Sequence, residues 1–378
     1  MNYLLLLFPI IIFVILFAGA DVAKKGEYTE DAWGLDQAKA LRVFAALMVM
    51  LHHLVQTISQ YGNVDKGPVT IWNSLGILFT SVFFFFSGFG LYKGYRTKPD
   101  YLKGFLRRRL LTIYIPFQIT NILYLIVFWN SKVKGVGDAI TSFFGLTLIN
   151  SNAWFVVELL LLYIAFFICF RYARSEKTAI ICLTGFTVFM VVGSLLLGHY
   201  NSPVRHWFRG EWWYNTTLIF ILGILVAKYE SRVKAFLMKG YRFILPALAV
   251  LFAGWYLLEE FILSRFGYYQ EWEGHPGYGA KFLSLPFQVI LCAIFVFLLL
   301  HISLKVRYKN RVLLFLGGIS FEIYLIHEMF RELLPGGPGR ALPDILYLAL
   351  VYILSVVAAC LLAFVDRKMI DAFVKRKG

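Results

Sequence analysis

Charged residues are scarce in this chain. Only 16% of its 378 residues are Asp, Glu, Lys or Arg, whereas 60% are hydrophobic. A soluble domain usually carries about 25% charged residues, so this chain has too few of them to cover a surface in water. The low charge therefore excludes a soluble globular protein and favours a protein whose solvent is a lipid bilayer.

Cysteine is also rare, and its spacing excludes two further classes of protein. The four cysteines lie inside apolar stretches, and no two of them form a Cys-x-x-Cys motif; they are Cys169, Cys182, Cys292 and Cys360. Cysteines in such surroundings are typically buried and inert. We therefore expect neither a disulfide framework nor a metal site.

Long polar segments are absent as well, which leaves no room for a soluble domain. Instead, apolar stretches follow one another, most of them close to the roughly 20 residues that cross a bilayer as a helix. We count eleven: 3–19, 38–59, 71–91, 110–129, 152–170, 178–199, 212–228, 243–263, 282–304, 312–330 and 345–365. They predict an all-α, polytopic bundle of transmembrane helices. Residues 35–378 form its membrane domain with a short basic tail, and residues 1–34 hold an extra helix and a linker.

The first apolar stretch is also compatible with a cleaved signal peptide. A signal peptide carries positive charge before its apolar core, but residues 1–3 are uncharged, whereas Lys24 and Lys25 follow the core. This polarity favours a retained helix whose N-terminus lies outside. Small residues within 17–20 would allow cleavage, so that alternative stays open.

The formal net charge of +15 raises the question of nucleic-acid binding. The basic residues, however, lie in short runs between apolar stretches, which is typical of cytoplasmic loops. With the N-terminus outside and the C-terminus in the cytoplasm, 27 of the 37 lysines and arginines fall in cytoplasmic segments and 9 in external ones. We expect a multi-pass protein of the cell membrane in this orientation, with membrane lipids and not nucleic acid as partners.

Ionisable side chains inside spanning helices are expensive, so each is a candidate functional residue. Arg42 and His53 lie eleven residues apart, which is about three helical turns and roughly 16 Å, on one helix face. His327 lies at a similar depth in the tenth stretch, on the same face as Ser320 and Tyr324. Two histidines at one level indicate a common site. The alternative is two unrelated imidazoles bonded to backbone or water.

Two features near the cytoplasmic side have both a structural and a binding explanation. Ser87 and Gly88 follow four phenylalanines at the expected end of the third helix. Gly88 allows close approach of either a neighbouring helix or a ligand. Arg107, Arg108 and Arg109 precede the fourth stretch, where they either anchor the protein to anionic lipid or hold phosphate oxygens.

Trp154 lies near the start of the fifth stretch, and Glu158 follows one turn later. A tryptophan at this place is typical of the membrane interface. Glu158 lies inside the apolar run and needs a partner, for which the histidines and arginines are candidates. A purely structural ion pair is equally compatible with its position.

Together these segments resemble the acyltransferase-3 family of membrane acyltransferases. Five motifs occur in the family's order: Arg42 with ten residues before His53, Phe86-Ser87-Gly88-Phe89, Phe105-x-x-Arg108-Arg109 leading to Pro116, Trp154-Phe155 with Glu158 and Tyr163, and Ser320-Phe321 with Tyr324-Leu325-Ile326-His327. Each is weak alone, but the ordered set covers about residues 35–365. The resemblance implies a ten-helix core, here preceded by one extra helix, that modifies surface or secreted carbohydrates, most often by O-acetylation. Thr112 departs from the pattern, because the family often has an arginine there.

The resemblance assigns functional importance to Arg42, His53, Arg108 and Arg109. We expect the donor to be acetyl-CoA or another acyl-CoA, without a metal cofactor. The expected catalytic residues are His53, as general base or transient acyl acceptor, with Glu158 and His327 in support. The expected acyl-CoA contacts are Arg42, Arg108, Arg109, Ser87 and Gly88, and the expected substrate contacts are Trp154 and Tyr324.

The expected acceptor is a glycan or glycolipid hydroxyl that arrives from the outer side. Aromatic residues of external loops are candidates for stacking on sugar rings, although anchoring at the interface explains them equally well; they are Trp207, Trp212, Trp213, Tyr268, Tyr269 and Trp272. A homo-oligomer remains open. The rival function is a transporter or flippase for a glycan or lipid-linked precursor, which broken helices in two matching halves would indicate.

Overall fold

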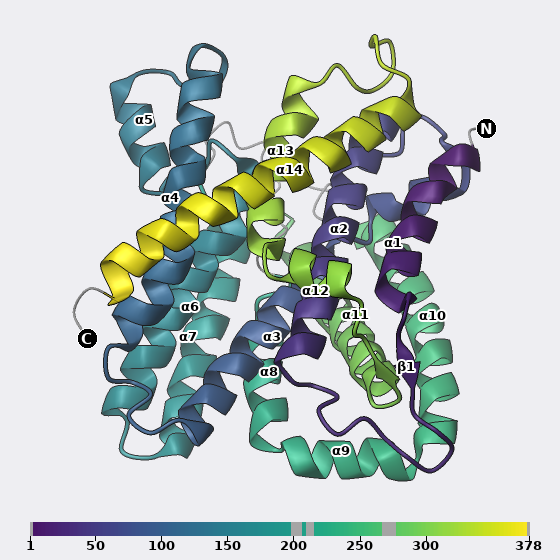
Figure 1. The fold of residues 1–378 in the computed structure, drawn as a ribbon, viewed down its shortest axis with the longest axis vertical. Helices are drawn as coiled ribbons and strands as arrows, with labels where there is room; N and C mark the ends of the chain where they lie inside the picture. Colours follow the sequence, from purple (N-terminus) through teal and green to yellow (C-terminus); the bar gives the residue numbers. More distant parts are fainter. Residues whose placement is uncertain (1–2, 198–205, 209–214, 267–276, 376–378) are drawn as a thin grey trace. The chain divides into compact units, whose positions relative to one another are not determined.

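The computed structural model describes residues 3–197, 206–208, 215–266 and 277–375, and nearly all of their regular structure is helical (Figure 1). The α-helices are α1 (Leu7–Phe17), α2 (Leu35–Ser59), α3 (Gly76–Thr97), α4 (Phe105–Lys132), α5 (Val136–Phe143), α6 (Trp154–Tyr172), α7 (Glu176–Leu197), α8 (Leu218–Lys228), α9 (Glu230–Lys239), α10 (Tyr241–Phe266), α11 (Tyr278–Ser303), α12 (Arg311–Gly317), α13 (Ser320–Leu333) and α14 (Asp344–Ile370). Short 3₁₀ segments occupy Tyr3–Leu6 (η1), Gly67–Asn73 (η2) and Ser151–Ala153 (η3), and a π-helical segment, Asp371–Lys375 (η6), follows α14. The predicted all-α class is confirmed.

Within the described residues, eight helices are long and apolar enough to cross a membrane, and the bent pair of α12 and α13 makes up to nine. The chain is therefore a multi-pass membrane protein. Each of the eleven predicted stretches overlaps a helix, but Tyr3–Phe17 and α8 are shorter than a full span. Because α8 begins only at Leu218, its 11 residues extend about 16 Å. The predicted stretch 212–228 is therefore too long, and its residues 212–214 lie outside the described residues.

The chain divides into two compact units. Unit 1 comprises residues 1–83, 237–245 and 296–364, and α2 is its central helix. α2 is apolar on most sides, which is typical of a helix enclosed by others, and α1, α12 and α13 pack against it. The Gln37 side chain donates to and accepts from the backbone of Tyr308, at 3.0 Å in each case. The start of α2 is thereby fixed to the segment that precedes α12.

The N-terminal helix is part of unit 1. Phe8 stacks on Tyr352 with ring centroids 5.7 Å apart, and Phe13 packs on Phe44 at 5.3 Å. Beyond the helix, β1 (Asp21–Val22) pairs with β2 (Val306–Arg307) in a short antiparallel ladder. α1 therefore packs along α2 and α14 as an integral element of the unit.

The tenth apolar stretch is broken, so the prediction of one continuous helix over 312–330 is wrong. α12 and α13 meet at an angle of 75°. The break follows Gly317, and a β-carbon on this residue would lie 2.8 Å from the carbonyl oxygen of Lys39. Glycine is needed here because the backbone approaches α2 so closely. Beyond the bend, α13 packs against α2.

Unit 2 comprises residues 84–236, 246–295 and 365–378, and in it α6 packs against α4 and α7. The prediction that the third helix ends near Gly88 is wrong, because α3 continues to Thr97. Its last two turns carry Lys93 and Arg96, which pair with Glu230 at 3.2 Å and Glu176 at 3.0 Å. These ion pairs stabilise the extension beyond the apolar part of the helix.

α3 and α8 cross in unit 2 through two glycines. A β-carbon on Gly88 would collide with the carbonyl oxygen of Phe220, and one on Gly223 would collide with that of Phe85. Small residues at such a crossing let two backbones approach closely within a membrane. Helix packing therefore accounts for Gly88, and its predicted contact with acyl-CoA remains untested.

We predict that Gly88→Ala lowers the free energy of unfolding by about 1–3 kcal/mol, because the new methyl group overpacks the crossing. Thermal or chemical unfolding in detergent micelles measures the change. Gly90→Ala is the matched control, since a β-carbon there meets no atom within 4 Å. Alanine favours a helix by roughly 1 kcal/mol over glycine, so the control is neutral or stabilising. Equal stability of the two variants would contradict the role given to the crossing.

Candidate active site

The imidazoles of His53 and His327 lie face to face in unit 1. α2 supplies His53 and α13 supplies His327, and their ring centroids are 5.5 Å apart with an angle of 18° between the planes. His327 is 1% exposed, and His53 is half-buried. The ring of His52 lies 4.8 Å from that of His53. The structure thus brings together the two histidines that the sequence placed at one depth, while their chemical roles stay predictions.

Hydrogen bonds orient both rings. Nδ1 of His327 bonds the carbonyl oxygen of Tyr324 at 2.7 Å, and Nδ1 of His53 bonds Oε1 of Gln56 at 3.3 Å. A carbonyl oxygen only accepts, so each Nδ1 donates a proton, and a neutral ring then presents its lone pair at Nε2. Within the described part of the chain, Nε2 of His327 has no hydrogen-bond partner. An imidazole held in this way can take up a proton or attack an electrophile.

A buried ion pair beside the histidines is a feature that the sequence analysis missed. Glu328 is fully buried, and Nε of Arg331 lies 2.6 Å from its carboxylate. Arg331 also donates to the hydroxyl of Thr57 at 2.7 Å, which donates to the carbonyl oxygen of His53 at 3.0 Å. This network joins α13 to α2 next to the paired imidazoles. The available signal was an acid and a base three residues apart at the end of an apolar stretch.

The other predicted residues of unit 1 lie beside the histidine pair or farther along its two helices. Tyr324 is buried, and its ring centroid lies 5.9 Å from those of both His327 and Phe83. Ser320 donates to the carbonyl oxygen of Gly317 at the bend. Arg42 is half-buried, and its Nε donates to the carbonyl oxygen one turn earlier. Tyr324 therefore contacts the histidine pair, whereas Arg42 lies about three turns away from it.

Glu158 lies in unit 2, and its partner corrects the expectation of a histidine or an arginine. Its carboxylate is fully buried and accepts a hydrogen bond from the hydroxyl of Thr217. The second oxygen, Oε2, has no partner among the described residues, and neither do Oδ1 of Asn215 and Oγ1 of Thr216. Buried polar atoms without partners are costly. This group is therefore a candidate for binding hydroxyl groups of a ligand.

The arginine pair of unit 2 lies against Tyr101. Arg108 is exposed and donates to the carbonyl oxygen of Tyr101 at 3.1 Å, and the guanidinium of Arg109 lies 5.6 Å from the centre of its ring. Burial raises the pKa of the Tyr101 phenol, so the ring stays neutral beneath the cation. Arg107 donates to the carbonyl oxygen of Phe373. Arg42 belongs to unit 1. That it binds the same coenzyme phosphates as Arg108 and Arg109 therefore stays a prediction.

The two remaining residues that were predicted to contact ligands, Trp154 and Ser87, lie in unit 2. Trp154 is 5% exposed, and its ring centroid lies 6.2 Å from that of Phe84. Ser87 is half-buried on α3. Trp154 is thus part of an aromatic core, which accounts for it without a ligand, and its predicted substrate contact remains untested.

Of the external aromatic residues, only Trp207 is described, and it is half-buried against Phe208 with ring centroids 5.6 Å apart. The others lie outside the described residues: Trp212, Trp213, Tyr268, Tyr269 and Trp272. Among the described residues, no three or more His, Cys, Asp or Glu side chains form a group that could hold a metal ion.

We predict that Arg331→Met lowers the free energy of unfolding by about 3–5 kcal/mol, because it leaves the Glu328 carboxylate buried without its partner. The double variant Glu328→Leu with Arg331→Met should recover most of this loss, since no uncompensated charge remains. Unfolding in detergent micelles measures both variants.

The exposed ion pair between Asp36 and Lys39 provides the control. Asp36→Asn breaks this pair in α2, and exposed pairs contribute less than about 1 kcal/mol. An Arg331→Met variant that is no less stable than Asp36→Asn would show that the buried pair does not hold α13 to α2.

Comparison with known proteins agrees with the sequence motifs. A family model described as an acyltransferase domain matches residues 35–364, which is nearly the whole chain. No match was found among curated proteins or among solved structures. The matched region contains both histidines, the buried ion pair and the arginine cluster. The chain belongs to the acyltransferase-3 family, and it is a membrane acyltransferase.

Proposed function

We propose that the protein transfers an acyl group, namely acetyl as the family resemblance implies, from a cytosolic acyl-CoA to a hydroxyl of a surface or secreted glycan or glycolipid. The observation that carries this proposal is the stacked pair of His53 and His327 inside spanning helices. Membrane-embedded imidazoles are costly to maintain. The two imidazoles lie side by side, and Nδ1 of each ring is hydrogen-bonded to an oxygen. This arrangement is suited to proton transfer.

The donor is proposed to bind through its phosphates to the arginine pair of unit 2. Guanidinium groups bind phosphate oxygens through two parallel hydrogen bonds. Arg108 is exposed, and Arg109 is held over the ring of Tyr101, so both charges are fixed near the start of α4. Arg42 is proposed as a further phosphate contact.

His53 can catalyse the transfer by either of two mechanisms, as a general base or as a nucleophile. As a base, Nε2 takes the proton of the acceptor hydroxyl while its oxygen attacks the thioester carbonyl carbon. The carbon–sulfur bond breaks, and the CoA thiolate takes that proton from the imidazolium. As a nucleophile, Nε2 attacks the carbonyl carbon first and releases the thiolate. The acceptor oxygen then displaces the imidazole, and its proton goes to the thiolate.

Other groups support these steps. His327 lies parallel to His53 and keeps Nε2 without a described partner, so it is proposed to orient the first ring or relay its proton. The network of Glu328, Arg331 and Thr57 fixes the backbone at His53. Glu158, whose Oε2 has no partner among the described residues, is proposed to bind an acceptor hydroxyl in unit 2.

The transporter or flippase alternative finds less support. It would be favoured by broken helices in two matching halves of the chain. In the described residues, one bent pair, α12 and α13, passes as a broken span. A single break, which lies where Gly317 approaches Lys39 at the start of α2, is better explained by this close contact.

We predict that His53→Ala lowers acyl transfer by about 10²–10⁴-fold, because the general base is lost. The assay follows loss of acyl-CoA thioester and labelling of a glycan acceptor by the purified protein. His206→Ala is the control, since this histidine lies in unit 2 and bonds the carbonyl oxygen of Leu146. Wild-type acylation by a folded His53→Ala protein would disprove the assignment.

The orientation is proposed from the distribution of basic residues, with the protein in the cell membrane, the N-terminus outside and the C-terminus in the cytoplasm. We predict that green fluorescent protein fused after residue 378 fluoresces. Alkaline phosphatase inserted between α13 and α14 should be active, because that segment then lies outside. Reporter activities in whole cells measure both. The reverse pattern would invert the topology and place the arginine cluster away from cytosolic acyl-CoA.

A further inference from the structure

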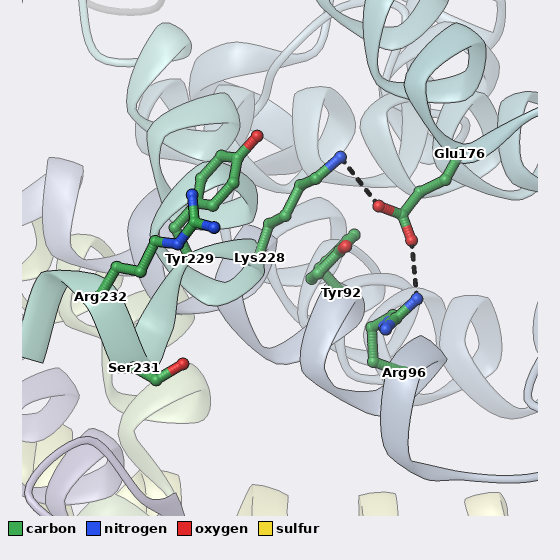
Figure 2. Close-up of a pocket in the computed structure, with 7 residues that line it drawn as sticks. All are labelled: Tyr92, Arg96, Glu176, Lys228, Tyr229, Ser231 and Arg232. Carbon is green, nitrogen blue, oxygen red and sulfur yellow. Dashed lines mark hydrogen bonds and ion pairs between the residues drawn. The ribbon is translucent and has the colours of Figure 1, made fainter.

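A small basic pocket lies in unit 2, where α3 and α8 end and α7 and α9 begin (Figure 2). It has a volume of about 250 Å³ and is lined by Tyr92, Arg96, Glu176, Lys228, Tyr229, Ser231 and Arg232. None of these residues belongs to the family motifs or to the proposed transfer site. The pocket is therefore a separate feature that needs its own explanation.

The lining carries three cations and one carboxylate. Glu176 pairs with Lys228 at 2.9 Å and with Arg96 at 3.0 Å, as the dashed lines of Figure 2 show. The carboxylate thereby holds two cations on one side of the pocket. An ammonium has three donors and a guanidinium has five, so both retain donors for a further anion.

The third cation of the pocket is Arg232. Arg232 is exposed in the first turn of α9, and its guanidinium lies 5.9 Å from the centre of the Tyr229 ring. No ion pair joins Arg232 to a carboxylate within the described residues. The nearby Glu230 is engaged by Lys93 and by Lys234. The pocket therefore keeps an excess of positive charge.

The start of α9 adds to this charge. The first N–H groups of a helix have no partner within the helix, and its N-terminus carries a partial positive charge. Ser231 lines the pocket in that first turn. An anion in the pocket would thus meet guanidinium groups, an ammonium and the N-terminus of a helix, which is the combination that binds phosphate.

We infer that this pocket binds a phosphate group that forms one end of a larger molecule. Its volume of about 250 Å³ lies below the roughly 300–1,000 Å³ of pockets that enclose whole drug-sized ligands. It also lies at the ends of membrane-spanning helices, where lipid headgroups are found. The phosphate can therefore come from an anionic lipid headgroup or from the nucleotide end of a coenzyme. The inference does not rest on the proposed acyl transfer.

The test compares two double variants of the full-length protein in neutral detergent. Arg96→Gln with Arg232→Gln removes two pocket charges and keeps the ion pair between Lys228 and Glu176. Arg171→Gln with Lys177→Gln removes two exposed charges that do not line the pocket. Both variants lose two positive charges. A difference in their affinity for the probe therefore reflects the pocket and not the net charge of the protein.

Binding is measured with two probes. Coenzyme A is titrated by calorimetry, and phosphatidic acid is compared with phosphatidylcholine by native mass spectrometry. The pocket variant should bind the recognised probe at least about tenfold more weakly than the wild type, because two charge-assisted hydrogen bonds are lost. The control variant should stay within about twofold, and the probe that responds identifies the source of the phosphate.

Equal weakening by both double variants, or no weakening of either probe by the pocket variant, would overturn the inference. Arg232→Gln alone is the second variant, because Arg232 is exposed and its removal disturbs no described ion pair. It keeps the test decisive if the double variant fails to fold. The acyl-transfer assay is not used as a readout, so failure here is distinguishable from failure of the proposed function.

Discussion

The absence of water from the bilayer is the constraint on which this structure depends. A charged or polar side chain inside a spanning helix must find its partner within the protein. Glu328 does so through Arg331, and Arg331 extends the contact to Thr57 on α2. Such a pair is weak evidence for stability by itself, but removal of one partner is costly. It therefore fixes how α13 lies along α2, and with it the relation between the two imidazoles.

The absence of water also limits the partners with which the two histidines can exchange protons. In water, an imidazole at neutral pH exchanges protons freely with solvent, whereas in a spanning helix its partners are few and fixed. Nδ1 of His53 and Nδ1 of His327 are each engaged by an oxygen acceptor. The remaining nitrogen of each ring is then the atom available for substrate. Orientation by a second group is the usual requirement of a catalytic base.

Three close helix contacts in this protein depend on glycine. Gly88 and Gly223 let α3 and α8 cross in unit 2, and Gly317 lets α12 approach the start of α2 in unit 1. In a membrane the hydrophobic effect does not drive helices together, so close backbone contact supplies much of the attraction. The tenth apolar stretch bends by 75° just after the close contact at Gly317. The helix that carries His327 therefore starts at this break and not at the beginning of the stretch.

Residue type and helical spacing within one segment were enough to predict the all-α membrane class, the approximate position of each apolar helix and the common level of His53 and His327. The sequence did not reveal the end of α3 at Thr97, the break after Gly317 or the hydroxyl partner of Glu158. The pairing of Arg331 with Thr57 was also decided by the tertiary structure. Each of these depends on which side chain or carbonyl from a distant segment comes within hydrogen-bond or van der Waals distance, and periodicity within one helix carries no such information.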